Sequence, residues 1–378
     1  MGSTASGIAN SCTPNNTLDL SLYEDIANEF ALYKTIDTVI IMIVNPCILA
    51  VGLLGNLGFL FVMARVRRMW TVTNIYLTNL AVADTSFLVI GVSEKIARYR
   101  ASPLAANQAI LGTMGCIVVY TLLDVAYFVG LCLVTLVTIE KYYAICRPIQ
   151  HRLIAGKKRT IKLVSFVWGM AWVFGLGLLP CWSNFMGLCT IWPDTEDFSR
   201  HPAVFGTCLP EASWLIDFHN GLQAVPFFVC LIINVTLYGL IIKSLHTRIG
   251  VVGTGTANDQ TTAQKNKKAE RQRVRNQVTR MLIVNGVVFF TLMAPFQCSS
   301  FAFVIVNQTL NYVLTVEQVD KLLVVNRVLL YLNPAVNPYI YLMTNARIRR
   351  AYKQAFTFCR KTRRVDSTSM LDVTTLNS

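Results

Sequence analysis

The segment over residues 116–148 restricts the fold of this chain more than any other. It opens at Cys116, continues as an almost unbroken apolar stretch, and ends with the adjacent charges Glu140 and Lys141. The stretch is longer than the roughly 20 apolar residues with which a helix crosses a lipid bilayer. One acid, Asp124, lies inside it, about two helical turns after the cysteine. We therefore expect a long transmembrane helix with a cysteine near one end and a charged group at the other.

Seven apolar segments of comparable length divide the chain, and they predict an all-α membrane protein, a seven-transmembrane helix bundle within residues 36–345. The expected spans are 36–64, 73–97, 113–146, 160–181, 215–246, 276–305 and 320–343. The composition agrees with a polytopic membrane protein, because charged residues make up 14% of the chain, whereas a soluble domain carries about 25%.

The chain after the last span divides into two parts. Residues 346–359 place Ile348 and Tyr352 on one face and basic residues elsewhere, which predicts a short amphipathic helix at the cytoplasmic membrane interface, in contact with membrane lipid. Cys359 at its end is a candidate for palmitoylation, with an unmodified thiol as the alternative. Residues 360–378 are rich in Ser and Thr, and we expect a disordered cytoplasmic tail open to phosphorylation.

Basic residues gather in alternate loops, and this pattern sets the expected orientation. Representative members of the four clusters are Arg65, Arg67, Arg68, Arg147, Arg152, Lys157, Lys158, Lys265, Lys267, Lys268, Arg271, Arg347, Arg349, Arg350 and Arg360. This positive-inside pattern makes residues 1–35 an extracellular N-terminal tail and leaves the C-terminus in the cytoplasm of a plasma-membrane protein. The net charge of +14 could suggest nucleic-acid binding, but its distribution over alternate loops argues against a nucleic-acid partner.

The cysteines and sequons of the expected exterior loops predict modifications. The 11 cysteines show no zinc-ligand spacing, so we expect no metal site. A disulfide is plausible for Cys116, Cys189 and Cys208, with Cys116–Cys208 the preferred pair and Cys189 the rival. Glycosylation sequons begin at Asn15 and Asn307, both in segments expected to be extracellular.

Polar residues inside the apolar spans are functional candidates, because each is costly in a bilayer. The set comprises Asn56, Asp84, Asn333 and Asn337. The alternative reading is that these side chains only form hydrogen bonds that hold the bundle together. For Asp84 such hydrogen bonds are not enough, since a carboxylate in mid-membrane requires a partner cation, water or a proton. Two prolines, Pro334 and Pro338, favour a kink beside the asparagines.

Motifs in all seven spans resemble those of the rhodopsin-like (class A) G-protein-coupled receptors, in family order and spacing over essentially the whole folded length. They are Gly55-Asn56, Leu80-Ala81-Val82-Ala83-Asp84, Cys116, Glu140-Lys141-Tyr142, Trp168, Tyr238, Pro295 and Asn337-Pro338-Tyr339-Ile340-Tyr341. Each motif alone is weak, and their combination is very specific.

The resemblance implies a set of residues for switching and for coupling to a heterotrimeric G protein, with arrestin and receptor kinases acting at the tail. This set comprises Glu140, Lys141, Tyr142, Tyr238, Phe289, Met293, Pro295, Asn337, Pro338 and Tyr341. Tyr238 and Tyr341 are expected to swing together on activation. Asp84, Asn333 and Asn337 form the central polar pocket, where the family binds sodium.

Four positions depart from the family pattern. Lys141 replaces the usual arginine, which keeps the charge and loses the planar guanidinium. Met293 replaces a tryptophan, while Phe289 is retained one turn earlier. Arg275 stands where some members carry an acid, so that the lock to the arginine cannot form. Gly130 replaces a serine, which weakens the case for structural sodium at Asp84.

The charges expected at the outer ends of the spans indicate a peptide ligand. The set comprises Glu94, Lys95, Arg98, Asp124 and Arg327, with Tyr331 at the position where opsins carry the retinal lysine. Amine receptors carry their aspartate at the position of Leu123, one residue before Asp124. Mixed charges suit the several polar groups of a peptide, and the resemblance is nearest to receptors of the thyrotropin-releasing-hormone, neuromedin U and ghrelin type.

We therefore expect a neuropeptide receptor that is not an enzyme, with Gq-type coupling favoured. A class A receptor for a small amine or a lipid is the alternative. A transporter or channel that uses Asp84 and Asp124 is a more distant one, because the chain shows no inverted repeat. An intramembrane enzyme would need a buried nucleophile–base or metal constellation, and the four histidines lie in loops or at span ends.

Overall fold

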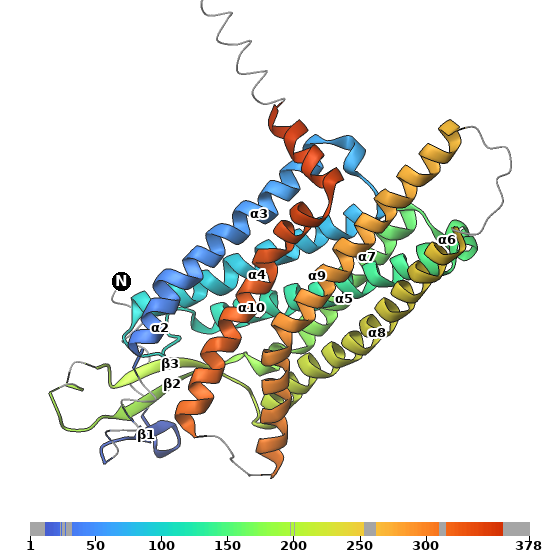
Figure 1. Ribbon diagram of the computed structural model, residues 1–378. Coiled ribbons are helices and arrows are strands. Elements are labelled where there is room, and N and C mark those ends of the chain that lie inside the picture. The colour runs from blue at the N-terminus through green and yellow to red at the C-terminus, as the bar shows by residue number, and fades with distance from the viewer. Residues whose placement is uncertain are drawn as a thin grey trace, which may run out of the picture.

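A computed structural model describes residues 12–22, 24, 27, 32–196, 198, 199, 201–252, 262–309 and 315–357. Its long helices form one bundle (Figure 1), as the seven apolar segments predict. The first crossing is continuous from α2 (Thr35–Val39) through a π-type turn (Ile40–Val44) into α3 (Asn45–Arg65). The remaining crossings are α4 (Val72–Ala101), α5 (Gly112–Cys146), α7 (Lys157–Gly177), α8 (Trp214–Val252), α9 (Thr262–Thr309) and α10 (Val316–Thr344).

Length and composition qualify six of the described helices for crossing a membrane, namely all of these crossings except α10. The hydropathy of α10 is lowered by Asn326, Arg327, Asn333 and Asn337, and the same asparagines are buried against neighbouring helices. Large apolar side chains face outward from the bundle: Leu54 is 74% exposed and Val173 is 71% exposed. Such a surface is costly in water and suits contact with lipid.

Helix α5 occupies the centre of the bundle. It is the most buried of the candidate membrane helices and packs against α4, α7, α8 and α9. Helix α10 packs against α9, α3 and α4 on the other side of the bundle. The predicted central segment therefore positions most of the polar side chains described below.

One end of the bundle, here named the sheet end, carries a three-stranded sheet that the sequence did not predict. Strand β2 (Asn184–Ile191) pairs antiparallel with β3 (Val204–Leu209), and β1 (Thr17–Asp19) adds to β2 in parallel. Two disulfides, Cys116–Cys208 and Cys12–Cys189, fasten this end. The first is the preferred pair of the sequence prediction, and the rival Cys189 instead bonds to Cys12.

The opposite end, here named the basic end, carries α6 (Pro148–Ile154) and a helix over residues 346–357. The apolar face of that last helix is partly buried against the bundle. Ile348 and Ala355 are each 1% exposed, whereas Phe356 is 55% exposed and lies against Phe61 of α3, with ring centroids 5.6 Å apart.

Several boundaries differ from the sequence prediction; α4, for example, continues to Ala101 instead of ending at residue 97. Helix α7, the fourth crossing, ends at Gly177 and is followed by a 3-10 turn over Leu179–Cys181. Helix α9 begins at Thr262, well before the predicted residue 276, because a polar run can continue a helix beyond the membrane. Asn307 lies in the last turn of α9, so the prediction that its sequon falls in a loop was wrong. Its Nδ2 donates to Asp217 Oδ1 at 2.8 Å.

Candidate functional site

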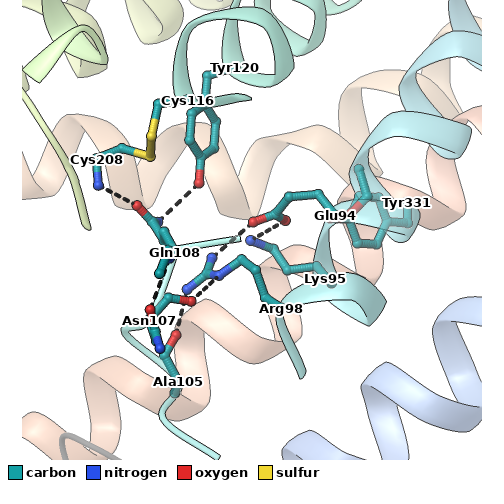
Figure 2. A network of polar contacts seen from close by, with 12 residues as sticks. Glu94, Lys95, Arg98, Ala105, Asn107, Gln108, Cys116, Tyr120, Cys208 and Tyr331 are labelled. Carbon is teal, nitrogen blue, oxygen red and sulfur yellow. Dashed lines mark hydrogen bonds and ion pairs between the residues drawn. A yellow bond between two sulfur atoms is a disulfide. The ribbon is translucent and has the colours of Figure 1, made fainter. Parts of the chain in front are cut away.

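The polar cluster at the sheet end of α4 centres on Glu94 (Figure 2). Arg98 Nη1 donates to Glu94 Oε1 at 3.0 Å, and Lys95 Nζ lies 2.7 Å from Glu94 Oε2. The two cations therefore share one carboxylate, whose side chain is only 2% exposed. Burial of this triad is tolerable because each charged group has a partner of opposite sign.

The guanidinium of Arg98 also holds the loop that follows α4. Its Nε donates to the carbonyl oxygen of Asn107 at 3.1 Å, and its Nη2 donates to that of Ala105. Gln108 continues the network, since its Nε2 donates to Tyr120 OH at 3.1 Å and its Oε1 accepts from Cys208 N at 2.6 Å. Figure 2 shows this chain of contacts running from α4 to the disulfide. Arg98, predicted to bind ligand, thus has its donors occupied by the protein.

Arg327 and Tyr331 of α10 lie beside this cluster. Arg327 is half-buried and within electrostatic range of Lys95, Tyr120 and Tyr331. Tyr331 is buried, and its hydroxyl donates to the carbonyl oxygen of Gly91 at 3.2 Å. A Cβ at Gly91 would lie 2.8 Å from the Tyr331 ring, so a glycine is needed for this approach of α10 to α4.

Asp124 belongs to a second cluster, formed between α5 and α8. Gln223 Nε2 donates to Asp124 Oδ1 at 2.7 Å, and His219 Nε2 lies 3.3 Å from the same oxygen. Asp124 is 4% exposed, and its Oδ2 is buried with no hydrogen-bond partner in the described part of the chain. The His219 ring makes an edge-to-face contact with Trp182, 5.0 Å between centroids.

Sequence reasoning missed His219 and Gln223 as the partners of Asp124. Their signal is the spacing of four residues between two polar side chains in an otherwise apolar helix, which places both on one face. The single set of predicted ligand-binding residues is therefore divided into two clusters. The first comprises Glu94, Lys95 and Arg98 with Arg327, and the second comprises Asp124 with its two α8 partners.

The polar residues in mid-bundle link α3, α4 and α10. Asn337 Nδ2 donates to Asp84 Oδ2 at 2.8 Å. Asn56 Nδ2 donates to the carbonyl oxygen of Pro334 at 3.1 Å. That carbonyl has lost its helical partner because Pro338 has no N–H. Asn56 therefore has the bundle-holding role that the alternative reading gave it.

A cavity of about 30 Å³ lies beside Asp84 and is lined by Gly130, Phe289, Met293 and Asn333 among others. Its volume suits one water molecule or one small ion. The side-chain oxygens of Asn333 and Asn337 are buried without partners in the described structure, and carboxylate and amide oxygens are the ligands that hard cations take. Gly130 adds no oxygen. These oxygens thus fit a small cation, although Gly130 supplies one ligand fewer than the serine usual at its position. Sodium binding here stays a prediction.

The adjacent charges at the basic end of α5 do not pair with each other. Glu140 Oε1 lies 2.8 Å from His151 Nε2 of α6, and Lys141 Nζ donates to Thr73 Oγ1 of α4. Lys141 and Thr73 line a cavity of about 180 Å³ together with Asn74, Arg347 and residues of α9. Tyr142 packs beside the buried Ile145, Tyr238 and Ile241.

The two switch tyrosines have separate partners in this conformation. Tyr238 OH lies 3.0 Å from Thr138 Oγ1 and 3.5 Å from the carbonyl oxygen of Leu282. Tyr341 is 1% exposed and packs edge-to-face on Phe59, 5.6 Å between ring centroids. Phe289 and Met293 are buried in the main core cluster, and Pro295 lies within α9.

Three predicted positions lie outside the described structure. Cys359 and the tail from residue 360 are not among the described residues, and neither are the side chains of Asn15 and Arg275. Palmitoylation, glycosylation of Asn15 and the absence of an α9 lock therefore stay predictions.

Comparisons with known proteins agree with the motif analysis. The family model described as 7 transmembrane receptor (rhodopsin family) matches residues 55–341. Neuromedin-U receptor 2 of Mus musculus is 27% identical over 314 residues, which cover 83% of this chain and 74% of that protein. The thyrotropin-releasing hormone receptor is 26% identical over 349 residues in Bos taurus, with coverage of 86% and 79%. Its Homo sapiens counterpart is also 26% identical, over 347 residues.

Proposed function

The chain belongs to the rhodopsin family of seven-transmembrane receptors, and from this premise we propose that it binds an extracellular peptide and signals through a heterotrimeric G protein. Family membership makes it a multi-pass membrane receptor and not an enzyme. The peptide ligand is supported by relatives named for neuromedin U and thyrotropin-releasing hormone.

The observation that carries this proposal is the presence of two separate polar clusters at the sheet end. One is rich in cations and contains Lys95 and Arg327, and the other contains the buried acid Asp124. A small amine needs one acidic partner, whereas a peptide presents polar groups along its length. Two clusters of opposite sign on different helices suit the larger ligand.

The proposed orientation places the sheet end outside the cell. Both disulfides of the described residues lie there, and disulfides persist in oxidising compartments. The basic residues of the loops at the opposite end support the same direction. The N-terminus is then extracellular, and the helix over residues 346–357 is cytoplasmic.

Peptide binding is expected to shift an equilibrium between conformations that already exists in the free receptor. The basic end would open by movement of α9, which breaks the contact of Tyr238 with Thr138 and widens the cavity beside Lys141. The G protein would bind there, with Gq-type coupling favoured. Arrestin and receptor kinases would act at the tail beyond residue 360.

The test is a calcium and cyclic-AMP screen of peptides on cells that display the receptor, with Asp124→Asn and Arg327→Ala beside the wild type. We expect a saturable wild-type response whose half-maximal concentration rises about tenfold or more in each variant, which corresponds to about 1.4 kcal/mol. Asp194→Asn, an exposed acid in the loop between β2 and β3, is the control and should respond as the wild type.

Two outcomes would contradict the proposal. A wild-type receptor that reaches the surface and answers no peptide, but answers a small amine or a lipid, would establish the alternative ligand class. Transport of an ion without any G-protein signal would favour the transporter instead.

A further inference from the structure

The polar cluster between α4 and α10 has more positive than negative charge. Lys95 lies within electrostatic range of Arg98 and Arg327, and among the described residues Glu94 is the carboxylate that contacts Lys95 and Arg98. Both oxygens of Glu94 are engaged, Oε1 by Arg98 and Oε2 by Lys95. Asp124 does not compensate, since its carboxylate contacts Gln223 and His219. Among the described side chains of this cluster, three cations therefore accompany one acid.

The three cations differ in what they have left to offer a ligand. Each of the three guanidinium nitrogens of Arg98 already donates to the protein, to Glu94, to Asn107 and to Ala105. Lys95 has three donor protons and one partner, and its side chain is 17% exposed. Arg327 has no hydrogen bond or ion pair with any residue that the structure describes, and it is half-buried. Lys95 and Arg327 thus retain unused donors.

The surroundings make this excess charge costly. Lys95 and Arg327 are within electrostatic range of each other, and Arg327 is also within range of Tyr120 and Tyr331. Like charges in a poorly hydrated setting repel more strongly than they do in bulk water. The tyrosine hydroxyls bring no negative charge to the cluster: Tyr331 donates to Gly91, and Tyr120 accepts from Gln108 and interacts with Glu94. An incoming anion would relieve it and would use the free donors.

We propose that Lys95 and Arg327 form an anion-binding site that takes a carboxylate of the ligand. This inference rests on the proposed peptide-receptor function and adds the ligand's charge. The carboxylate comes either from a free C-terminus or from an Asp or Glu side chain. A guanidinium and an ammonium on two helices can hold one carboxylate between them through charge-assisted hydrogen bonds. A ligand that lacks any carboxylate leaves Lys95 with Glu94 as its partner and adds no anion for Arg327.

The experiment uses a peptide library in which each sequence is made in four matched forms. The C-terminus is a free acid or an amide, and the acidic side chains are either present or replaced by Asn and Gln. Each form is titrated on cells that display the wild type, Lys95→Gln, Arg327→Gln or Lys321→Gln. Lys321 is an exposed lysine on the same helix as Arg327, so it serves as the charge-matched control. Surface labelling of an N-terminal tag corrects for expression.

We expect that removal of one carboxylate from the active peptide raises the half-maximal concentration at least tenfold. Comparison of the amidated forms with the forms whose acidic side chains are replaced identifies which carboxylate binds. In Lys95→Gln and Arg327→Gln the difference between the acid and neutral forms should fall below threefold, while Lys321→Gln keeps the full difference. Lys95→Arg, which retains the charge, should recover most of it.

Two results separate the failure of this inference from the failure of the proposed function. If fully neutral, amidated forms activate the wild type as well as the acid forms do, the receptor is a peptide receptor without the anion site. If no form of any peptide activates the wild type at the cell surface, the peptide-receptor proposal fails, and the anion site for a peptide carboxylate fails with it.

Discussion

Gly286 of α9 lies beneath Tyr238 of α8 in a contact that only a glycine allows. A Cβ at position 286 would lie 1.8 Å from the Tyr238 hydroxyl oxygen and 2.7 Å from the ring carbon that carries it. Tyr238 can therefore rest on the α9 backbone while its hydroxyl contacts Thr138 and Leu282. One side chain thus connects α5, α8 and α9 near the basic end.

We predict that Gly286→Ala raises signalling without ligand. The new methyl group would displace Tyr238 and break its hydrogen bond to Thr138, a loss of about 1 kcal/mol that changes a two-state ratio about fivefold. Basal inositol phosphate or cyclic-AMP levels, divided by surface expression, measure the effect. Gly239→Ala is the control, because a Cβ there meets no atom within 4 Å. Equal basal signalling in both variants would mean that the Tyr238 contact does not hold α9.

The buried acid Asp124 and the adjacent pair Glu140 and Lys141 show what a sequence can indicate about side-chain contacts. Asp124 stood out as a charge in an apolar span, and the structure does bury it. Its partners His219 and Gln223 could not be deduced, since which residues of two helices meet depends on how those helices pack. For the same reason, two charged residues that are adjacent in the chain need not contact each other. Glu140 and Lys141 are neighbours in the chain, yet they contact His151 and Thr73 on different elements.

Among the elements, the helices were predictable and the sheet was not. Long apolar segments must satisfy their backbone hydrogen bonds internally in a membrane, so each is a helix. Strand β1 has three residues and pairs with residues more than 170 positions away, for example Thr17 with Cys189. So short a segment has no periodic signal. The N-terminal segment taken as a tail is therefore part of the sheet end.

We predict that the Cys12–Cys189 disulfide is what keeps β1 on the sheet, because three residues of pairing are a weak restraint. In Cys12→Ser/Cys189→Ser, hydrogen exchange at residues 17–19 should rise at least tenfold while the helices keep their protection. In Cys116→Ser/Cys208→Ser, which frees the start of α5 from β3, surface expression should fall strongly. Cys47→Ser removes an exposed free thiol and should change neither. Unchanged exchange without the first disulfide would show that β-pairing alone suffices.

At the scale of the whole molecule, the clusters proposed to bind the ligand and the cavity proposed to bind the G protein occupy opposite ends of one bundle. Linkage requires the coupling to be reciprocal: a peptide that favours G-protein binding must be bound more tightly when the G protein is present. Polar contacts in mid-bundle, such as Asp84 with Asn337, connect the helices between the two ends. A substitution at the basic end should therefore alter the affinity for the peptide at the sheet end, although the substituted residue does not contact the peptide.

We predict such a remote effect for Thr73→Val, which keeps the side-chain shape and removes the hydroxyl that accepts from Lys141 Nζ. A hydrogen bond to a charged group contributes about 1.5–3 kcal/mol, and its loss destabilises the present conformation relative to one in which Lys141 contacts the G protein. Agonist affinity should rise about tenfold in membranes that contain G protein and much less after its removal. Thr78→Val, whose hydroxyl only contacts its own helix at Asn74, is the matched control. A rise of equal size with and without G protein would show that Thr73 acts on the ligand site directly and not through the equilibrium.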